Sequence, residues 1–548
     1  MRTGLLTLAS SMSLSLLACA GGGGMSSSSN SGAGDGQHVG AGPVTLTDVL
    51  TYHNDTARTG QNLSETALTP ANVNAASFGK LRLLAADGHV DAAPLIANGL
   101  MIGGAKHNVV YVASEHDSVY AYDVDTGSLL LQVSLLPNGE TPSDARSCGQ
   151  VAPEIGITAT PVIDRSAGAN GTLFVVAMSK DAQGSYYQRL HALDLLSLQD
   201  RLAAVVIQAS SPGNGPDSAQ GVVSFDAKQY KERGALLLSH GQIFTEWASH
   251  CDIPAYNGWI MAFDEGSLTQ TAVLDITPNG SEAAMWDVAG LEADSAGAVY
   301  TTAGNGTFDT VLNGSGQPAQ QDYGNSVLKL ALTATTLGVS DYFTPSNTVS
   351  LSDNDVDFGS GSPMLLPDQL DANGQTRHLM VAAGKDGTLY LLDRDHLGQF
   401  NGSANQVYQA LDSALPGGLF SAPAYFNGSV YLADVGGTLK AYTLSQARLS
   451  AAPSSQSNAS FSYPGSAPAI SANGGSNGIV WALESAVGSA AVLHAYNPAN
   501  LAQEYYNSTQ AANGRDAIGN GEKFITPVIA NGKVFVGTPT GVAMFGLR

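Results

Sequence analysis

Short runs that alternate β-branched or aromatic residues with small ones recur along most of this chain. Each unit opens on a small or Pro-containing stretch, such as Asp91-Ala-Ala-Pro-Leu-Ile or Ile525-Thr-Pro-Val-Ile. Two apolar runs separated by a few polar residues follow, as in Val109-Val-Tyr-Val-Ala-Ser and Ser118-Val-Tyr-Ala-Tyr-Asp. This alternation between Gly- and Asp-rich turns predicts strands and not helices.

The unit occurs eight times between Val90 and the C-terminus. Repetition of four-stranded units at this period predicts an all-β fold, an eight-bladed β-propeller of antiparallel blades. The last copy stops at Arg548 after its third strand, and Phe78-Gly-Lys-Leu-Arg-Leu-Leu precedes the first full copy. We therefore expect the N-terminal strand to complete the last blade, which leaves no open sheet edge. A linear β-solenoid is the alternative, but its rungs are shorter and more regular.

The beginning of the chain has the pattern of an export signal. Met1-Arg-Thr precedes an apolar stretch from Gly4 to Leu17, which is too short to span a membrane. The sequence Leu16-Leu-Ala-Cys19 resembles the bacterial lipobox, in which the Cys is lipidated and becomes the mature N-terminus. We expect a signal peptide over 1–18, a lipidated Cys19 with a Gly/Ser-rich tether over 19–46, and one propeller domain over 47–548. A plain secretory signal is the alternative.

The lipobox resemblance also implies a location. A residue other than Asp after the lipidated Cys, here Ala20, is similar to the outer-membrane sorting signal of Gram-negative bacteria. We expect a monomer in the cell envelope that contacts the membrane only through its lipid anchor. The formal net charge of −23 argues against nucleic-acid or anionic-membrane partners, because phosphate groups would be repelled.

Two cysteines remain once Cys19 is assigned to lipid. Cys148 lies in the connection leading into the second unit, and Cys251 lies between the middle strands of the third. These loop types emerge on the same face of a propeller. Neighbouring units in an oxidising compartment favour a Cys148–Cys251 disulfide, with two unpaired thiols as the alternative.

Motifs in the fourth and fifth units resemble the PQQ-dependent quinoprotein alcohol dehydrogenases, a family of eight-bladed propellers. The resemblance covers the whole propeller as architecture and about 286–394 at the level of motifs. In chain order, the motifs are Trp286, Thr302-Ala-Gly-Asn-Gly, Gln321-Asp-Tyr-Gly-Asn-Ser-Val-Leu-Lys-Leu and Ala383-Gly-Lys-Asp-Gly-Thr-Leu-Tyr-Leu-Leu-Asp-Arg.

The resemblance implies a role for each matching residue. Trp286 would lie flat beneath the quinone, Asn305 would ligate Ca²⁺, and Lys385 would donate to the quinone carbonyl. Asp322 would be the base that removes the proton of the substrate hydroxyl. Such chemistry uses a Lewis acid, a cation and a carboxylate around the quinone. Asp252 is the residue available to replace the family's calcium-ligating Glu, two positions displaced.

The chain also departs from the family. It has no adjacent pair of cysteines and no Cys-x-x-Cys-His for a covalent haem. Each matching residue has a structural alternative: Asn305 and Lys385 as turn residues, Trp286 as packing between blades, and Asp322 as a turn cap.

The loops that hold these residues are expected to project to one face, together with Asp91, Glu154 and Asp357. Two functions follow from this reading. One is oxidation of an alcohol or polyol with PQQ and Ca²⁺. The other is a non-catalytic propeller that binds a protein, glycan or cell-wall partner through that face.

Overall fold

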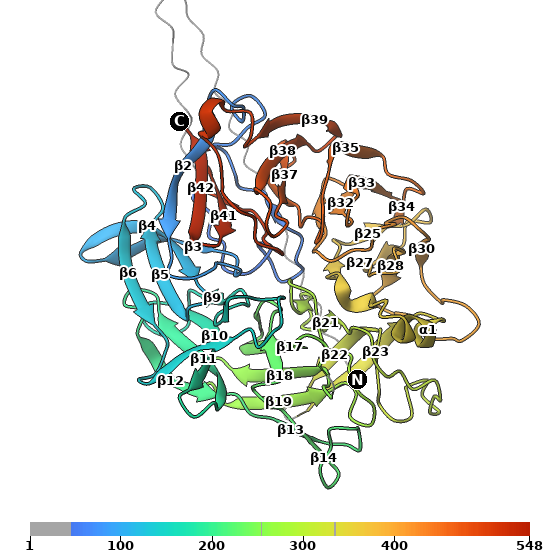
Figure 1. The fold of residues 1–548 in the computed structure, drawn as a ribbon. Coiled ribbons are helices and arrows are strands. Elements are labelled where there is room, and N and C mark those ends of the chain that lie inside the picture. Colours follow the sequence, from blue (N-terminus) through green and yellow to red (C-terminus); the bar gives the residue numbers. More distant parts are fainter. Residues whose placement is uncertain (1–44, 254, 334–335) are drawn as a thin grey trace, which may run out of the picture. The chain divides into compact units, whose positions relative to one another are not determined.

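Eight antiparallel sheets surround a central axis in the part of the chain that the structure describes (Figure 1). The computed structural model describes residues 45–253, 255–333 and 336–548. These residues belong to one compact unit, 42–548. The predicted all-β, eight-bladed propeller is therefore confirmed. The expected signal peptide, Cys19 and the tether as far as residue 44 lie outside the described residues.

Each blade contributes one strand near the axis and three strands further out. The first four blades consist of these strands, from the axis outward: β3 (Leu95–Ile102), β4 (Ala105–Ala113), β5 (Ser118–Asp123), β6 (Leu129–Ser134); β9 (Val162–Asp164), β10 (Thr172–Asp181), β11 (Tyr186–Asp194), β12 (Asp200–Val206); β16 (Leu237–Ser239), β17 (Gln242–Ser249), β18 (Trp259–Asp264), β19 (Gln270–Asp275); β20 (Glu292–Ala293), β21 (Val299–Thr302), β22 (Val327–Leu332), β23 (Leu337–Thr344).

The last four blades follow the same order: β24 (Met364–Leu365), β27 (Leu379–Ala382), β28 (Leu389–Asp393), β30 (Gln409–Leu411); β31 (Ala424–Phe426), β32 (Ser429–Ala433), β33 (Thr438–Ser445), β35 (Ser455–Ser460); β36 (Ala469–Asn473), β37 (Ser476–Glu484), β38 (Val492–Asn497), β39 (Asn500–Asn507); β40 (Val528–Ala530), β41 (Lys533–Thr538), β42 (Gly541–Leu547), β2 (Phe78–Ala85).

Smaller elements decorate the blades. They are β1 (Gln61–Asn62), β7 (Glu140–Asp144), β8 (Glu154–Ile155), β13 (Ser210–Pro212), β14 (Val222–Ser224), β15 (Tyr230–Glu232), β25 (Gln369–Leu370), β26 (Thr376–Arg377), β29 (Gln399–Phe400), β34 (Arg448–Leu449), the helix α1 (Thr348–Asp353), and two 3₁₀ turns at Phe358–Ser360 and Ala512–Gly514.

The ring closes through the N-terminal strand, as predicted. Strand β2 pairs antiparallel with β42, so that the first strand of the propeller completes the blade that ends the chain (Figure 1). Val110 and Tyr120 of the first blade pack with Phe535 of the last blade in one buried cluster. The apolar alternation read from the sequence thus places side chains in the interfaces between blades.

The segment 49–62 closes the axis from within, because it hydrogen-bonds to all eight blades. Its partners are residues of, or next to, the innermost strands: Ile96, Ile163, Leu236, Ala293, Leu365, Tyr425, Ile470 and Ile529. Six of them stand two residues after the proline of a repeat opening. The repeat opening therefore supplies a ring of inward-facing backbone groups, and the N-terminal segment satisfies them.

Arg58 is the most buried charged residue of this segment, with no exposed surface. Its guanidinium donates to Thr51 Oγ1 at 2.7 Å and to the backbone oxygens of Tyr52 and Leu236. The carboxylate of Asp55, which lies in the same segment, accepts hydrogen bonds from the backbone N–H and the hydroxyl of Thr59 and not from the Arg58 guanidinium. Arg58 therefore anchors the segment inside the channel.

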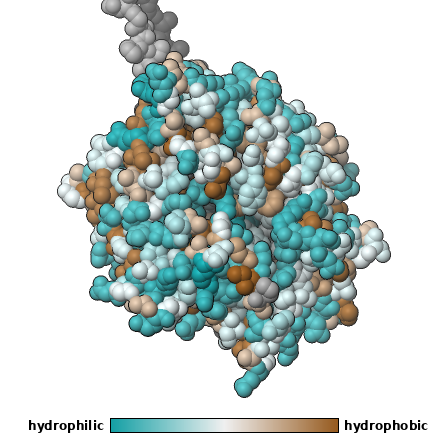
Figure 2. Space-filling model, viewed as in Figure 1, coloured by the Kyte–Doolittle hydropathy of each residue, from teal (hydrophilic) through white to brown (hydrophobic). Residues whose placement is uncertain are grey.

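The outer surface of the propeller is mostly hydrophilic, with apolar residues scattered singly on the face in view (Figure 2). Such scattering is ordinary for a soluble surface. Within the described ranges, we find no helix with the length and apolar character that crossing a bilayer requires.

Candidate functional site

The loops that lead into the innermost strands meet around a cavity of about 80 Å³ at one end of the axis. A second cavity of about 30 Å³ adjoins it and shares Gln150, Arg233 and Phe524 with the first. We call the two adjoining cavities the channel mouth. Tyr52 of the N-terminal segment lines the smaller cavity, so the segment that closes the axis lies next to the mouth.

The position three residues before the proline of a repeat opening lines the mouth in several blades. Asp91 and Thr158 line the smaller cavity from this position. Ser360 and Phe420 line the larger cavity from it, and Phe524 lines both. The sequence repeat therefore contains the signal for these residues, although the resemblance to quinoproteins does not point to them.

Three of the predicted site residues, Trp286, Asp252 and Lys385, line the larger cavity. Trp286 packs against the Ala-Gly-Asn-Gly turn, where a Cβ on Gly304 would lie 2.6 Å from the indole Cδ1. Gly304 is thus required for the close approach of the ring to the turn. The indole Nε1–H is buried and has no hydrogen-bond partner among the described residues.

Asn305 and Lys385 meet at Asp357, which the sequence placed on this face without a role. The Asp357 carboxylate accepts the Asn305 backbone N–H at 2.6 Å and lies 2.5 Å from Lys385 Nζ. Lys385 also bonds to Asp355 at 2.9 Å. Burial opposes the charge on Lys385, but Asp357 and Asp355 outweigh it and raise its pKa. Lys385 is therefore a paired cation rather than a free donor.

The Asn305 side chain leaves its oxygen unused. Its Nδ2 donates to Asp355 Oδ1 at 3.4 Å, whereas its buried Oδ1 has no partner among the described residues. Asp252, an exposed residue, accepts the Tyr256 hydroxyl at 3.0 Å. The predicted calcium ligands are thus near one cavity. Among the described residues, however, His, Cys, Asp and Glu side chains converge in a set of three only at another place, around His89.

Asp322 does not share the cavity with the other predicted residues. It is buried, and its Oδ1 accepts the backbone N–H groups of Asn279 and Gly280, each at 3.0 Å. Burial raises the pKa of this carboxyl group, while the two backbone bonds oppose the shift. The structure therefore shows Asp322 as a cap of the 277–280 turn, which is the structural alternative read from the sequence.

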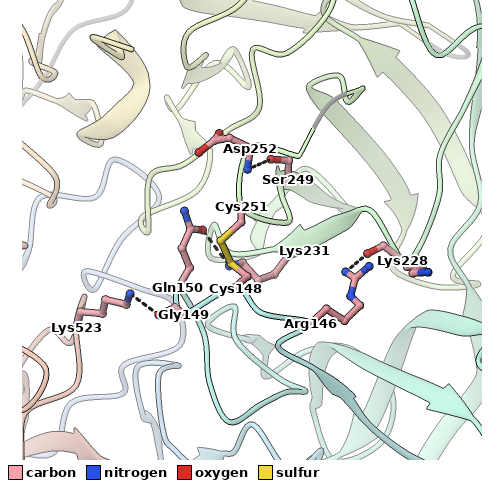
Figure 3. Close-up of a disulfide and its surroundings, with 10 residues drawn as sticks. All are labelled: Arg146, Cys148, Gly149, Gln150, Lys228, Lys231, Ser249, Cys251, Asp252 and Lys523. Atoms are coloured by element: carbon pink, nitrogen blue, oxygen red, sulfur yellow. Dashed lines mark hydrogen bonds between the residues drawn. A yellow bond between two sulfur atoms is a disulfide. The ribbon is translucent and has the colours of Figure 1, made fainter. Parts of the chain in front are cut away.

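Cys148 and Cys251 form a disulfide, so the structure contains the pairing expected from the sequence (Figure 3). The bond joins the loop before the second blade to the loop between β17 and β18. Gln150 and Asp252, which line the larger cavity, follow the two cysteines closely in sequence. The disulfide consequently anchors two parts of the rim to each other.

Aromatic rings and cations occupy the centre of the mouth. Tyr463 packs against Phe420 and Phe524 with ring centroids 5.4 and 6.0 Å apart. Arg233 Cζ lies 3.7 Å from the ring centroid of Phe524, a cation–π contact. Lys523 donates to the backbone oxygen of Gly149 at 3.0 Å (Figure 3). Burial and then the neighbouring charge of Arg233 lower the pKa of Lys523.

Comparison with solved structures places this arrangement in a known fold. A quinohemoprotein alcohol dehydrogenase from Comamonas testosteroni superposes with a TM-score of 0.59 at 15% identity, over 91% of this chain and 80% of that one. The corresponding enzyme ADHIIG from Pseudomonas putida HK5 gives a TM-score of 0.56 at 14% identity, over the same shares. The chain shares the β-propeller fold of these two enzymes.

Comparisons at the level of sequence identify no family for this chain. No protein-family model matches the chain, and no curated protein matches it. A structure of BamB from Moraxella catarrhalis also aligns, with a TM-score of 0.48 at 14% identity, over 85% of this chain and 97% of that one. At 14–15% identity, the two dehydrogenase alignments establish the fold alone.

The mouth does not fit a fused tricyclic cofactor. Pockets for ligands of that size commonly enclose about 300–1,000 Å³, whereas the larger cavity here is about 80 Å³. Arg233, Phe420, Tyr463 and Phe524 line the space. The carboxylate expected to act as base lies elsewhere. The residues at the mouth therefore do not provide the PQQ and calcium site that the resemblance implies.

Proposed function

We propose that this protein is an exported, lipid-anchored binding propeller of the bacterial cell envelope that holds the carboxylate of a sugar acid or acidic glycan at its channel mouth. The observation that supports this most strongly is Arg233. Its guanidinium lies on the Phe524 ring, and it has neither an ion pair nor a hydrogen bond within the described ranges. A guanidinium with its donors free is suited to bidentate binding of a carboxylate.

The aromatic rings supply the second part of the recognition. Tyr463 is 47% exposed beside Phe420 and Phe524, so an apolar surface is accessible next to a cation. Aromatic faces combine a large apolar contact with a polar edge, which suits the apolar face of a sugar ring. Arg233 would then orient the ligand through its carboxylate while the rings contact its body.

The overall charge limits the size of this ligand. A protein with a net charge of −23 repels long polyanions. At physiological ionic strength this repulsion is screened beyond about 8 Å, so a single carboxylate can still reach Arg233 and Lys523. We therefore favour a sugar acid or the acidic end of a glycan over a highly charged polymer.

The second candidate function is a quinoprotein dehydrogenase acting on an alcohol or polyol. Trp286 and Lys385 at the cavity, the unpartnered Oδ1 of Asn305 and the shared fold favour it. The cavity volume and the capping role of Asp322 speak against it. If bound, PQQ would supply hydride acceptance and Ca²⁺ would polarise its carbonyl.

Calorimetry or ligand-observed NMR with D-glucuronate, and with neutral D-glucose as the matched ligand, tests the first proposal. We expect glucuronate to bind more tightly than glucose, and Arg233→Met to remove the difference. Arg165→Met, a charge-matched change at a surface ion pair with Asp48, should leave it intact. Equal binding of the two sugars by the unaltered protein would contradict the proposal.

The second candidate is tested on the same protein with PQQ and Ca²⁺. Bound cofactor would raise the melting temperature and produce a quinone absorbance band. No shift at saturating cofactor removes the dehydrogenase function. A shift together with dye reduction that Asp322→Ala abolishes would instead replace the binding proposal.

A further inference from the structure

His89, Asp91 and Glu522 bring together one imidazole nitrogen and two carboxylates at the junction of the first and last blades. Their candidate ligand atoms all lie within 4.8 Å of one another. His89 Nδ1 and Glu522 Oε2 are 2.9 Å apart, with the two side chains 26% and 12% exposed. Ligands of a tetrahedral metal ion with bonds of 2.0–2.1 Å lie about 3.3 Å apart, so small side-chain movements would complete such a site.

The local backbone explains why two of these residues face the same way. His89 and Asp91 flank Val90, which is fully buried and whose N–H donates to the Thr538 oxygen at 3.1 Å. The residues on either side of this buried side chain both reach the cluster. Glu522 comes from the segment that leads into the last blade.

Glu115 is an independent observation that points to a ligand at this place. It is 1% exposed, and its Oε2 accepts the Gly156 N–H at 2.7 Å and the Thr158 hydroxyl at 3.1 Å. Its Oε1 is buried and has no hydrogen-bond donor among the described residues, and the same is true of Asp91 Oδ1. The two carboxyl groups can hydrogen-bond to each other only when one of them carries a proton. Glu115 lies beside this cluster, because its backbone N–H donates to the His89 oxygen at 2.8 Å.

The neighbouring cations do not satisfy these oxygens. Lys523 is held by the Gly149 oxygen, and Lys231 donates to Gln150 Oε1 at 3.4 Å. Arg233 lies on Phe524. Two buried carboxylate oxygens that face each other without a donor are costly, and either a shared proton or a metal ion relieves that cost.

We propose that His89, Asp91 and Glu522 bind a divalent transition-metal ion of the zinc class that joins the first and last blades. One imidazole nitrogen and two carboxylate oxygens, with water in the fourth position, form a four-coordinate set suited to Zn²⁺, whereas Ca²⁺ takes six to eight oxygen ligands. Glu115, which Gly156 and Thr158 hold in place, is then an outer-shell residue beside Asp91. The exposed edge of His89 provides the path of entry.

Zinc titration of the full chain after treatment with EDTA and dialysis tests this inference. We expect one Zn²⁺ per chain and a higher melting temperature, with Ca²⁺ giving neither. The isosteric changes Asp91→Asn and Glu522→Gln, and His89→Ala, should each weaken binding at least tenfold. His107→Ala is the matched control, because His107 of the same blade is paired only with Asp123 within the described residues.

The result that overturns the inference is equally definite. Absence of zinc binding by the unaltered protein would mean that the carboxylates share a proton and hold no metal. Equal binding by His89→Ala and Glu522→Gln would mean that zinc binds at other residues. Circular dichroism of each variant shows whether a loss of binding comes from unfolding, and Glu522→Gln preserves side-chain volume for this purpose. Glucuronate binding by His89→Ala separates this site from the sugar-acid proposal, because His89 lines neither cavity of the channel mouth and its loss should leave glucuronate binding intact.

Discussion

Removal of the Cys148–Cys251 disulfide should destabilise the propeller by a predictable amount. The bond joins residues 103 positions apart. In the chain-entropy treatment, a cross-link over about 100 residues restricts the unfolded chain by up to about 4.7 kcal/mol, and measured values are commonly 2–4 kcal/mol. We expect Cys148→Ser and Cys251→Ser each to lower the free energy of unfolding by about 2–4 kcal/mol.

This loss translates into a modest thermal shift because the protein is large. Unfolding entropy is about 2.1 cal/mol/K per residue, or about 1 kcal/mol/K for some 500 residues that unfold together. The melting temperature should therefore fall by about 2–4 °C in calorimetry. The double Cys→Ser variant should match the single variants, because either change removes the whole cross-link.

Adding a reductant distinguishes the stability lost with the cross-link from the stability lost by replacing buried cysteine side chains. Cys148 is only 4% exposed, so its replacement also changes buried contacts. The unaltered protein should melt at the temperature of the variants once dithiothreitol is present, and the variants should not respond to it. A variant that remains less stable by the same margin in reductant would refute the reasoning, as would two titratable thiols in the unreduced, unfolded protein.

Two further predictions test ring closure and charge. Leu84→Ala should lower the free energy of unfolding by about 2–5 kcal/mol in denaturant experiments, because Leu84 is 1% exposed where β2 closes the ring. The control Leu83→Ala, at a residue that is 41% exposed, should change it by less than about 0.5 kcal/mol. Equal effects of the two changes would show that β2 is not in this register. Burial opposes the charge on His494, but Glu484 and Glu504 outweigh it and raise its pKa above the usual 6.5. The stability that these ion pairs contribute is complete below pH 6.5 and is lost as the pH rises through the pKa of His494 in the folded protein. His494→Gln should therefore lower the free energy of unfolding by about 1–3 kcal/mol at pH 6 and by less at pH 9. A difference that does not depend on pH would contradict the ion pairs.

The fold could be predicted from the sequence because its signals are local and repeated. Period-two alternation marks each strand, and the prolines of the repeat openings mark six of the eight innermost strands. The strand at Phe78 belongs to no full repeat, and the repeat that ends at Arg548 lacks its fourth strand. Counting the strands therefore predicted that the first of these completes the last blade, as the pairing of β2 with β42 shows. Even the lining of the mouth is encoded locally, three residues before the prolines, although that meaning becomes visible only when the blades are assembled.

The identity of the site depended on contacts that no local pattern specifies. Asp322 matches the expected motif, yet the N–H groups of Asn279 and Gly280 occupy it, while Asp357 binds both Asn305 and Lys385. The volume of the mouth depends on how side chains from several blades pack together. His89 and Glu522 are neighbours only because the ring closes. Sequence determines the blades through short-range periodicity, whereas the tertiary structure decides which loops share a cavity.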